Sequence, residues 1–236
     1  MFSRRAKPSS PTPMEYWEAR YRAGRTSGAG SIGAMREWKW SVINGYVDVL
    51  DDVLDVGCGD LSFWEGRDCS RYVGLDLSES VLQANRRRRP RWSFIRADAA
   101  QFLRTRFRIV LCMDVLFHVL DESRYKAILR NLSVYADGWL FVGTWNRNPL
   151  ASGWSRGVSA FRTGGWMGGA AFLVAWSRRL VQSFTCNPSS SGSHQRYFAF
   201  EGSFDVFLGA GLRLVAIHPS PLDGGINAIY VFQRKA

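Results

Sequence analysis

Short apolar runs alternate with helix-like stretches through the middle of the chain. The helical periodicity is clearest over 79–89, where Ser78 stands in the N-cap position, and over 123–135. Strands separated by helices predict βαβ units and a mainly parallel sheet with both faces covered. The apolar runs, rich in β-branched and aromatic residues, predict strands over 52–57, 72–77, 92–97, 107–115 and 138–145.

Two further apolar runs, 212–218 and 227–233, lie close together near the end of the chain. The connection PSPLDGG is rich in turn-forming residues and too short for a parallel crossover, so the two strands must pair antiparallel. The pattern therefore predicts an α/β fold in which an open parallel sheet ends in an antiparallel C-terminal hairpin.

The segments outside this pattern set the expected domain organisation. Residues 1–13 contain a twin arginine but no apolar run of an export signal, which predicts a disordered tail. Residues 14–50 are predicted to form an N-terminal helical cap around a Gly- and Ser-rich loop. Residues 51–149 and 200–236 are predicted to form the core, with 150–199 inserted as a lid. The second helix of the cap shows an apolar stripe of Trp40, Ile43, Val47 and Leu50.

The inserted segment contains an apolar stretch, 166–176, between arginines and tryptophans. It is shorter than the about 20 residues that a bilayer span needs. A lid helix over the active site is the favoured interpretation. Its flanks resemble those of interfacial elements, which leaves peripheral membrane contact through 164–179 as an alternative.

Charge and cysteine content restrict the classes of partner and compartment. The formal net charge is +11, and nine arginines lie between Arg86 and Arg108. Such a field favours anionic partners, although a solvated basic face is the simpler interpretation. The cysteines form no C-x-x-C pair, which predicts neither a disulfide framework nor a metal site and favours a reducing, cytoplasmic compartment. They are Cys58, Cys69, Cys112 and Cys186.

The stretch VLDVGCGDLSFW (53–64) places a glycine loop directly after the first predicted strand. Gly57 and Gly59 let the backbone approach a ligand without a Cβ atom in the way. A dinucleotide site would carry a third glycine where this chain has Ser62, and Asp60 would repel a phosphate. The loop therefore favours a ligand without phosphate at this position.

Carboxylates accompany the first three predicted strands. Asp55 lies at the end of the first strand, and Asp76 ends the second, where a carboxylate can bind both hydroxyls of a ribose. Asp98 follows the third strand, where it can accept a hydrogen bond from an adenine amino group. S-adenosylmethionine combines a ribose, an adenine and a positively charged amino-acid end, so the ordered set predicts this cofactor.

The segments VLDVGCG, YVGLDLSESVL, RADAAQF and IVLCMDVLFHV resemble the successive motifs of class I S-adenosylmethionine-dependent methyltransferases, of the small-molecule type. The resemblance covers roughly residues 50–145. It implies a Rossmann-like, seven-stranded, mostly parallel sheet with a reversed final strand, which agrees with the predicted hairpin.

The resemblance also implies the residues that contact the cofactor. At the methionine end these are Asp55, Gly57 and Gly59, with Asp114 near the amino group or the acceptor. Many members carry a further glycine two residues after Gly59, and Leu61 in this chain predicts a tighter loop. At the nucleoside end the implied contacts are Asp76 to the ribose hydroxyls, Leu77 against the adenine, and Asp98 and Ala99 at the adenine edge.

The upstream stretch YWEARYRAGRTSGAGSIG resembles a segment that some small-molecule methyltransferases fold over the cofactor. The resemblance implies that Tyr16, Trp17 and Arg20 contact the methionine portion, with Arg20 facing its carboxylate.

Three side chains are candidates for the chemistry itself. Methyl transfer is an in-line displacement in which positioning supplies much of the rate, and a hydroxyl acceptor also needs a base. His118 follows the fourth predicted strand, and simple packing beside the cofactor is its alternative role. His194 ends the low-complexity stretch NPSSSGSH, and Tyr197 follows it. A role as a base or in acceptor binding fits His194, and loop ordering is its alternative. No convincing metal cluster is present.

The sequence lacks two features of nucleic-acid methyltransferases, and this restricts the class of methyl acceptor. The sequence after the fourth strand, DVLFH, lacks the [DNS]-P-P-[YFW] motif of enzymes that methylate nucleic-acid amines, and Cys112 is expected to be buried within the strand. We therefore predict methyl transfer to a hydroxyl or amine of a small hydrophobic or lipid-linked molecule. The alternatives are an RNA or protein methyltransferase using the Arg86–Arg108 patch, a non-catalytic cofactor-binding module, and a dinucleotide oxidoreductase.

Overall fold

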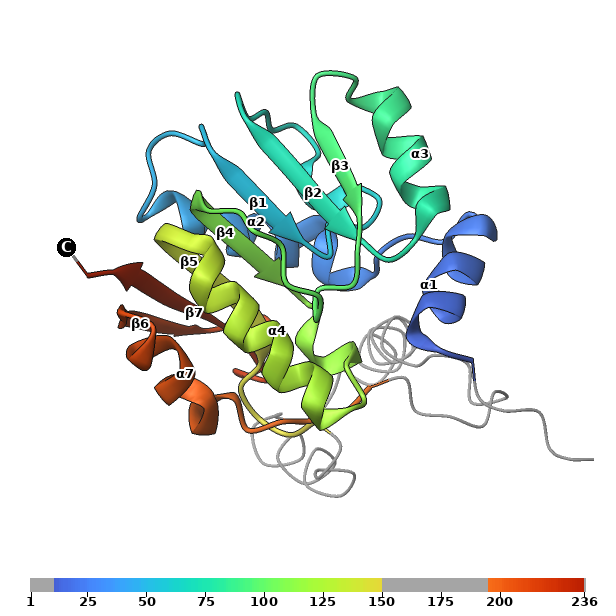
Figure 1. Cartoon of the computed structure of the whole chain (residues 1–236). Helices are drawn as coiled ribbons and strands as arrows, with labels where there is room; N and C mark the ends of the chain where they lie inside the picture. The colour runs from blue at the N-terminus through green and yellow to red at the C-terminus, as the bar shows by residue number, and fades with distance from the viewer. Residues whose placement is uncertain (1–10, 150–194, 236) are drawn as a thin grey trace, which may run out of the picture.

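The computed structural model describes residues 11–149 and 195–235 of the chain. Within these residues, seven strands form one sheet in the order β3-β2-β1-β4-β5-β7-β6 (Figure 1). The strands are β1 Val53–Val56, β2 Tyr72–Asp76, β3 Ser93–Arg96, β4 Phe107–Met113, β5 Ala136–Trp145, β6 Leu212–Pro219 and β7 Asn227–Arg234. The α-helices are α1 Pro13–Arg22, α2 Gly33–Asn44, α3 Glu79–Arg88, α4 Glu122–Tyr135 and α7 Phe204–Gly209.

The pairing of the strands confirms the predicted fold class. β1 is parallel to β2 and β4, and parallel pairing continues to β3 on one side and β5 on the other. β7 runs antiparallel to both β5 and β6, so the C-terminal hairpin closes that end of the sheet. Because β1 to β5 share one direction, their carboxyl ends meet at one edge, where ligands bind in open α/β sheets.

Helices cover both faces of the sheet. α4 and α7 pack on one face through apolar side chains such as Ile128, Leu132 and Phe207. α2 and α3 pack on the other face, where Trp40 and Ile43 of α2 lie in the same core as α3 (Figure 1). The central strands are therefore buried from both sides, which explains why their sequences are apolar rather than alternating.

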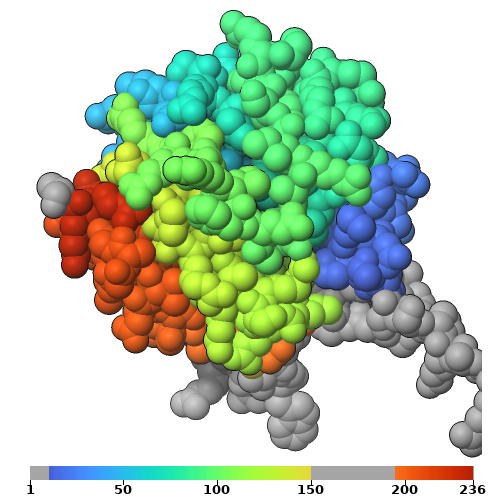
Figure 2. All heavy atoms as spheres, viewed as in Figure 1, coloured from blue at the N-terminus to red at the C-terminus, as the bar shows by residue number. Residues whose placement is uncertain are grey.

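The beginning of the described chain corrects one expectation. Thr12 and Pro13, which the prediction placed in the disordered tail, start α1 instead. The Thr12 hydroxyl accepts a hydrogen bond from the Glu15 backbone, and the Glu15 carboxylate accepts from the backbone N–H of Thr12 at 2.7 Å. This is a capping box with proline at N1, a strong helix-start signal. α1 then packs against α3, and Figure 2 shows its blue surface against the green central part of the chain.

The predicted stripe of the second helix is also too long. α2 ends at Asn44, so Val47 and Leu50 follow the helix rather than continue it. Gly45 and Tyr46 form a turn whose N–H groups bond back to Val42 and Ile43. Val47 is nevertheless buried, in the same apolar core as Trp40.

The predicted lid lies largely beyond the described part of the chain. Residues 150–194, which include 164–179, Cys186 and His194, fall outside it. Among the residues described, 11–149 and 195–235, no helix is long and apolar enough to cross a membrane.

Candidate functional site

A cavity lies at the carboxyl ends of β1, β2, β3 and β4. Each of these strands contributes an aspartate to it, either from its last residues or from the residues that follow. The side chains of the N-terminal segment, which we define as residues 13–33, form another wall. The structure brings together there most of the predicted cofactor residues: Asp55, Gly57, Asp76, Leu77, Asp98, Ala99 and Asp114.

The glycine loop is held by backbone hydrogen bonds to the end of β2. The N–H groups of Gly57 and Cys58 both donate to the Leu75 carbonyl, at 2.7 and 3.0 Å. Gly57 has φ of 78°, and a Cβ atom there would lie 2.3 Å from a methyl carbon of Val115. Asn85 of α3 donates its side-chain amide to the Gly59 carbonyl at 2.7 Å. Glycine at 57 is therefore required by both conformation and space.

The second half of the loop faces the N-terminal segment. Gly59 is not among the residues that line the cavity, and a Cβ there would lie 2.1 Å from the Ser27 hydroxyl. The Asp60 carboxylate accepts a hydrogen bond from the same hydroxyl at 2.7 Å. The loop thus presents Gly57 to the cavity, whereas Gly59 and Asp60 receive the N-terminal segment. The Asp60 carboxylate, which was expected to repel a phosphate, is not among the residues that line the cavity and is bonded to Ser27 instead.

Asp76 lies where the glycine loop, β2 and α3 meet. One carboxylate oxygen accepts from the Gly59 N–H at 3.0 Å and the other accepts from the Ser78 N–H at 2.9 Å. Burial raises the pKa of this carboxyl, and the backbone N–H groups of Ser78 and Gly59 oppose the rise. Each oxygen retains acceptor capacity beyond its single backbone bond.

Asp55 is held from inside the protein. One of its oxygens accepts hydrogen bonds from the Trp64 indole at 2.7 Å and from the Tyr72 hydroxyl at 2.9 Å. Burial raises the pKa of Asp55 to about 6, against the effect of these two bonds. The carboxylate therefore combines a fixed orientation with an unusually low acidity.

The other two aspartates are paired with cations. Asp98 lies 2.6 Å from the Arg124 guanidinium of α4, and Asp114 lies 2.5 Å from the ammonium of Lys39 on α2. Among the residues that the structure describes, no ion pair involves Asp55 or Asp76. The cavity thus keeps carboxylates without a cationic partner, which favours a ligand with positive charge.

The N-terminal candidates are divided by the structure. Trp17 lines the cavity, with Tyr16 packed edge-on against it at 5.3 Å between ring centroids. The Arg20 guanidinium lies 5.7 Å from the Trp17 ring and donates to the Thr26 carbonyl at 2.8 Å. Tyr16 and Arg20 are not among the lining residues. In this arrangement they support Trp17 and the following loop.

The candidate catalytic residues are likewise separated. His118 lines the cavity, and its ring meets the Trp17 ring edge-on at 4.9 Å. Tyr197 is not a lining residue. Burial, with a smaller contribution from the nearby Tyr197, raises the pKa values of Tyr125 in α4 and Tyr230 in β7. His194 lies outside the described residues. His118 is therefore the candidate base that this arrangement supports.

Several lining residues had not been singled out from the sequence. Tyr21, Ser27, Ser31 and Arg124 face the cavity. Tyr21 follows Trp17 by one helical turn and stacks on it at 5.7 Å, so helical spacing was a usable signal for this residue. Ser27, Ser31 and Arg124 carry no comparable signal, because their positions depend on how distant segments pack.

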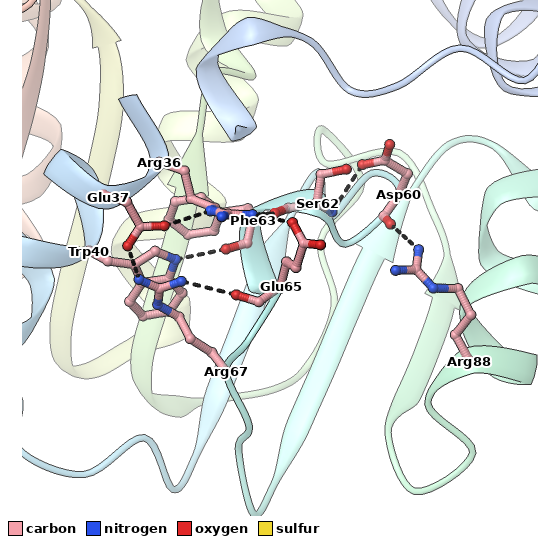
Figure 3. A network of polar contacts seen from close by, with 9 residues as sticks. All are labelled: Arg36, Glu37, Trp40, Asp60, Ser62, Phe63, Glu65, Arg67 and Arg88. Atoms are coloured by element: carbon pink, nitrogen blue, oxygen red, sulfur yellow. Dashed lines mark hydrogen bonds and ion pairs between the residues drawn. The ribbon is translucent and has the colours of Figure 1, made fainter. Parts of the chain in front are cut away.

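A polar network joins α2 to Ser62 and Phe63, which continue the glycine loop (Figure 3). Arg36 donates to the Ser62 carbonyl at 3.1 Å, and the Trp40 indole donates to the Phe63 carbonyl at 2.7 Å. Arg67 packs over the Trp40 ring and bonds to Glu37. α2 and the glycine loop are thereby joined into one unit. Arg88 of α3 adds a bond to the Asp60 carbonyl.

Methyltransferases are among the known proteins that are similar to this chain in sequence or structure. Residues 53–135 match a family described as a methyltransferase domain. A ubiquinone biosynthesis O-methyltransferase of Leptothrix cholodnii is 34% identical over 107 residues, which are 41% of this chain and 45% of that protein. A protein of the same name from Nitrosospira multiformis is 32% identical over 44% of this chain and 49% of its own length. The chain thus spans about half the length of the curated relatives it matches.

Solved structures share the fold at low sequence identity. Magnesium protoporphyrin IX methyltransferase from Synechocystis PCC 6803, with bound S-adenosylhomocysteine (SAH), has a TM-score of 0.58 and 16% identity, covering 94% of this chain and 98% of that one. The N-methyltransferase NodS from Bradyrhizobium japonicum WM9, also with SAH, has a TM-score of 0.55 and 15% identity, covering 86% and 88%.

The seven-stranded sheet and the cavity at its carboxyl edge define a Rossmann-like methyltransferase fold. Residues 53–135 match a methyltransferase domain, which agrees with the resemblance that the motifs had indicated, and the solved structures with bound SAH share the fold.

Proposed function

We propose that the chain transfers a methyl group from S-adenosylmethionine to a hydroxyl or amine of a small, hydrophobic molecule. The observation that carries this proposal is the convergence of four aspartates from four successive strand ends on one cavity, beside the glycine loop. The match of residues 53–135 to a methyltransferase domain supports the reaction class, and the names of the curated relatives support a small-molecule acceptor.

The cavity fits the proposed cofactor by its donor set. Asp76 is proposed to accept hydrogen bonds from both ribose hydroxyls. Its two oxygens are fixed by hydrogen bonds from backbone N–H groups and can each accept a further one. Leu77, Ala99 and Asp98 are proposed to hold the adenine, and Arg124 keeps the Asp98 carboxylate in place. Asp55, Gly57 and Asp114 are proposed to line the positively charged methionine end.

When bound, S-adenosylmethionine supplies a methyl group on a positively charged sulfur. The acceptor oxygen or nitrogen forms the new bond to the methyl carbon while the carbon–sulfur bond breaks, and the acceptor proton must leave. The chain is proposed to position the acceptor in line and to take that proton at His118. Trp17 holds the imidazole ring by edge contact.

The wall beyond the strand ends supports an apolar acceptor. Met113, Val115 and Val119 line the cavity on the side of β4, next to His118. Apolar walls with a few polar groups are typical of sites for small organic molecules. The Trp- and Arg-flanked stretch 164–179, outside the described residues, adds the proposal of peripheral contact with a membrane that contains the acceptor.

The proposal is tested by two assays on the full chain. Calorimetric titration with SAH should give a dissociation constant on the order of micromolar, about 8 kcal/mol of binding free energy. Methyl-labelled S-adenosylmethionine and a fractionated cell extract should then give label in the apolar organic fraction. SAH binding without label in any fraction would favour a non-catalytic module. Binding of NADH but not SAH would instead indicate an oxidoreductase.

The alternative of an RNA or protein methyltransferase has weaker support. Five of the nine arginines between Arg86 and Arg108 are paired with acidic side chains, which lowers their attraction for phosphate. The pairs are Arg86–Glu79, Arg89–Asp68, Arg91–Asp68, Arg106–Asp137 and Arg108–Asp51. RNA binding that weakens steeply between about 50 and 200 mM salt would revive this alternative.

A further inference from the structure

The N-terminal segment is joined to the strand-end loops at two places along its length. Glu18 of α1 accepts a hydrogen bond from the Ser78 hydroxyl at 2.7 Å, next to the end of β2. Ser27 donates from its hydroxyl to Asp60 at 2.7 Å, and the Asp60 N–H donates back to Ser27 at 3.0 Å. These contacts tie the segment to the loops that follow β2 and β1.

A third contact differs because it contains a buried charge. Lys39 of α2 is only 1% exposed, and its ammonium lies 2.5 Å from one Asp114 oxygen and 2.9 Å from the Gly30 carbonyl. Gly30 approaches so closely that a Cβ atom would lie 1.9 Å from the same Asp114 oxygen. A buried ammonium must keep its partners, so the Asp114 carboxylate and the Gly30 carbonyl are held together.

Asp114 has an uncommon backbone conformation at the edge of the cavity. It follows β4 directly, lines the cavity, and has φ of 61°, a left-handed conformation that is uncommon outside glycine and that aspartate adopts more readily than most residues. Its N–H donates to the Gly143 carbonyl at 2.9 Å. The ion pair with Lys39 holds the carboxylate of Asp114.

The helix that carries Lys39 is itself fixed. Arg36 and Trp40, on either side of Lys39 in α2, bond to the Ser62 and Phe63 carbonyls of the glycine loop (Figure 3). The ammonium therefore projects from a unit that includes the loop after β1, toward the residue after β4 and the end of the N-terminal segment.

We infer that Lys39 is a positioning residue: it couples closure of the N-terminal segment to the placement of Asp114 in the cavity. The inference deepens the proposed function and rests on it for the identity of the ligand. Loss of Lys39 should loosen the segment at Gly30 and displace Asp114 together. Bound cofactor should then dissociate more readily, although Lys39 is not itself a lining residue.

Lys39→Met tests the inference in the full chain, with SAH as the probe in calorimetry. The dissociation constant should rise about tenfold, which corresponds to about 1.4 kcal/mol. Lys126→Met is the matched control, because Lys126 forms an exposed pair with Glu122 on α4. The control should bind SAH within about twofold of wild type.

Two further variants separate positioning from stability. Gly30→Ala keeps every charge but inserts a methyl group into the contact with Asp114, whereas Gly202→Ala adds one in open space. Gly30→Ala should weaken SAH binding, and Gly202→Ala should not. Lys39→Met combined with Asp114→Asn removes the unpaired carboxylate, so it should recover thermal stability relative to Lys39→Met without recovering SAH affinity.

A measurement without ligand completes the test. An arginine-specific protease should cleave after the exposed Arg25 about tenfold faster in Lys39→Met than in Lys126→Met, since local opening governs cleavage. If Lys39→Met and Gly30→Ala lower the melting temperature but leave both SAH affinity and Arg25 cleavage unchanged, the positioning role is wrong. If wild type fails to bind SAH, the proposed function fails, and the cleavage rates alone decide whether Lys39 holds the segment.

Discussion

The indole of Trp64 donates a hydrogen bond of 2.7 Å to the carboxylate of Asp55 inside the protein. The Tyr72 hydroxyl donates to the same oxygen at 2.9 Å. Asp55 is only 3% exposed, and its pKa of about 6 reflects that burial. The first carboxylate of the glycine-loop motif is therefore oriented by aromatic side chains behind the sheet edge, before any ligand arrives.

This environment makes stability depend on pH. The unfolded chain loses the Asp55 proton near the ordinary pKa of 3.8, whereas the folded protein keeps it to about 6. The folded state binds more protons at Asp55 between these values, so the contribution of Asp55 to stability falls as pH rises from about 4 to about 6 and then levels off. The contribution of Asp55 is on the order of 3 kcal/mol.

Asp55→Asn should remove this contribution. In urea unfolding at several pH values between 4 and 7, the unfolding free energy of wild type relative to that of Asp55→Asn should fall as pH rises from about 4 to about 6. Burial also raises the pKa of Asp76, and the variant keeps that part of the pH dependence. Asp205→Asn, at an exposed position in the first turn of α7, should keep the wild-type slope. An unchanged slope in Asp55→Asn would show that Asp55 is ionised at low pH in the folded state.

Asp76→Asn should weaken SAH binding by tenfold or more, about 1.4 kcal/mol. The amide keeps one acceptor oxygen for the backbone, but loses the charge and the second acceptor proposed for the ribose hydroxyls. Asp52→Asn is a suitable control, since Asp52 precedes β1 at the opposite edge of the sheet and pairs with Arg71. Calorimetry measures both. Affinity within about twofold of wild type for Asp76→Asn would rule out the ribose assignment.

The parts of the site that follow from strand order could be predicted from the sequence. Asp76 and Asp98 stand at or just after the ends of β2 and β3, and parallel strands bring such positions to one edge. The C-terminal hairpin was predictable for a similar reason, because a short connection permits only antiparallel pairing. Both inferences use constraints that act along a short stretch of chain.

The contacts that complete the site act between distant segments. Lys39 and Asp114 are 75 positions apart, and nothing near either residue indicates the other. Gly59 was expected to approach the ligand, but the side chain that requires a glycine there is Ser27. The sequence indicates that no side chain fits at such a position. Only the packing shows which neighbouring residue occupies the space.

Leu61 occupies the position where many class I methyltransferases have glycine, and it has φ of 61° with its side chain buried. The left-handed conformation costs about 1–2 kcal/mol for a residue with a Cβ. Leu61→Ala removes most of the buried side chain but keeps a Cβ atom, so the conformational cost remains. Leu61→Gly removes the side chain and the conformational cost as well. We expect Leu61→Gly to be more stable than Leu61→Ala by about 1 kcal/mol in urea unfolding.

At a control position without a positive φ, the alanine variant should be more stable than the glycine variant. Leu116 is equally buried but lacks a positive φ, so Leu116→Gly should be less stable than Leu116→Ala by about 1 kcal/mol. If Leu61 and Leu116 gave the same order, the left-handed conformation at Leu61 would not be a feature of the folded protein.

His118→Gln tests the proposed base. Replacing a general base is expected to lower kcat by about 10²-fold or more for a hydroxyl acceptor. SAH affinity should stay within about twofold, because the imidazole is proposed to act on the acceptor rather than to bind the cofactor. Activity with labelled S-adenosylmethionine and calorimetry with SAH give the two quantities separately.

Tyr197→Phe provides the comparison, because Tyr197 was a candidate from the sequence but does not line the cavity. Its kcat should remain near that of wild type. A large loss of kcat in Tyr197→Phe, with none in His118→Gln, would move the proton transfer to the segment after residue 194. If His118→Gln weakened SAH binding as much as it lowered kcat, the ring would serve to pack Trp17 against the cofactor instead.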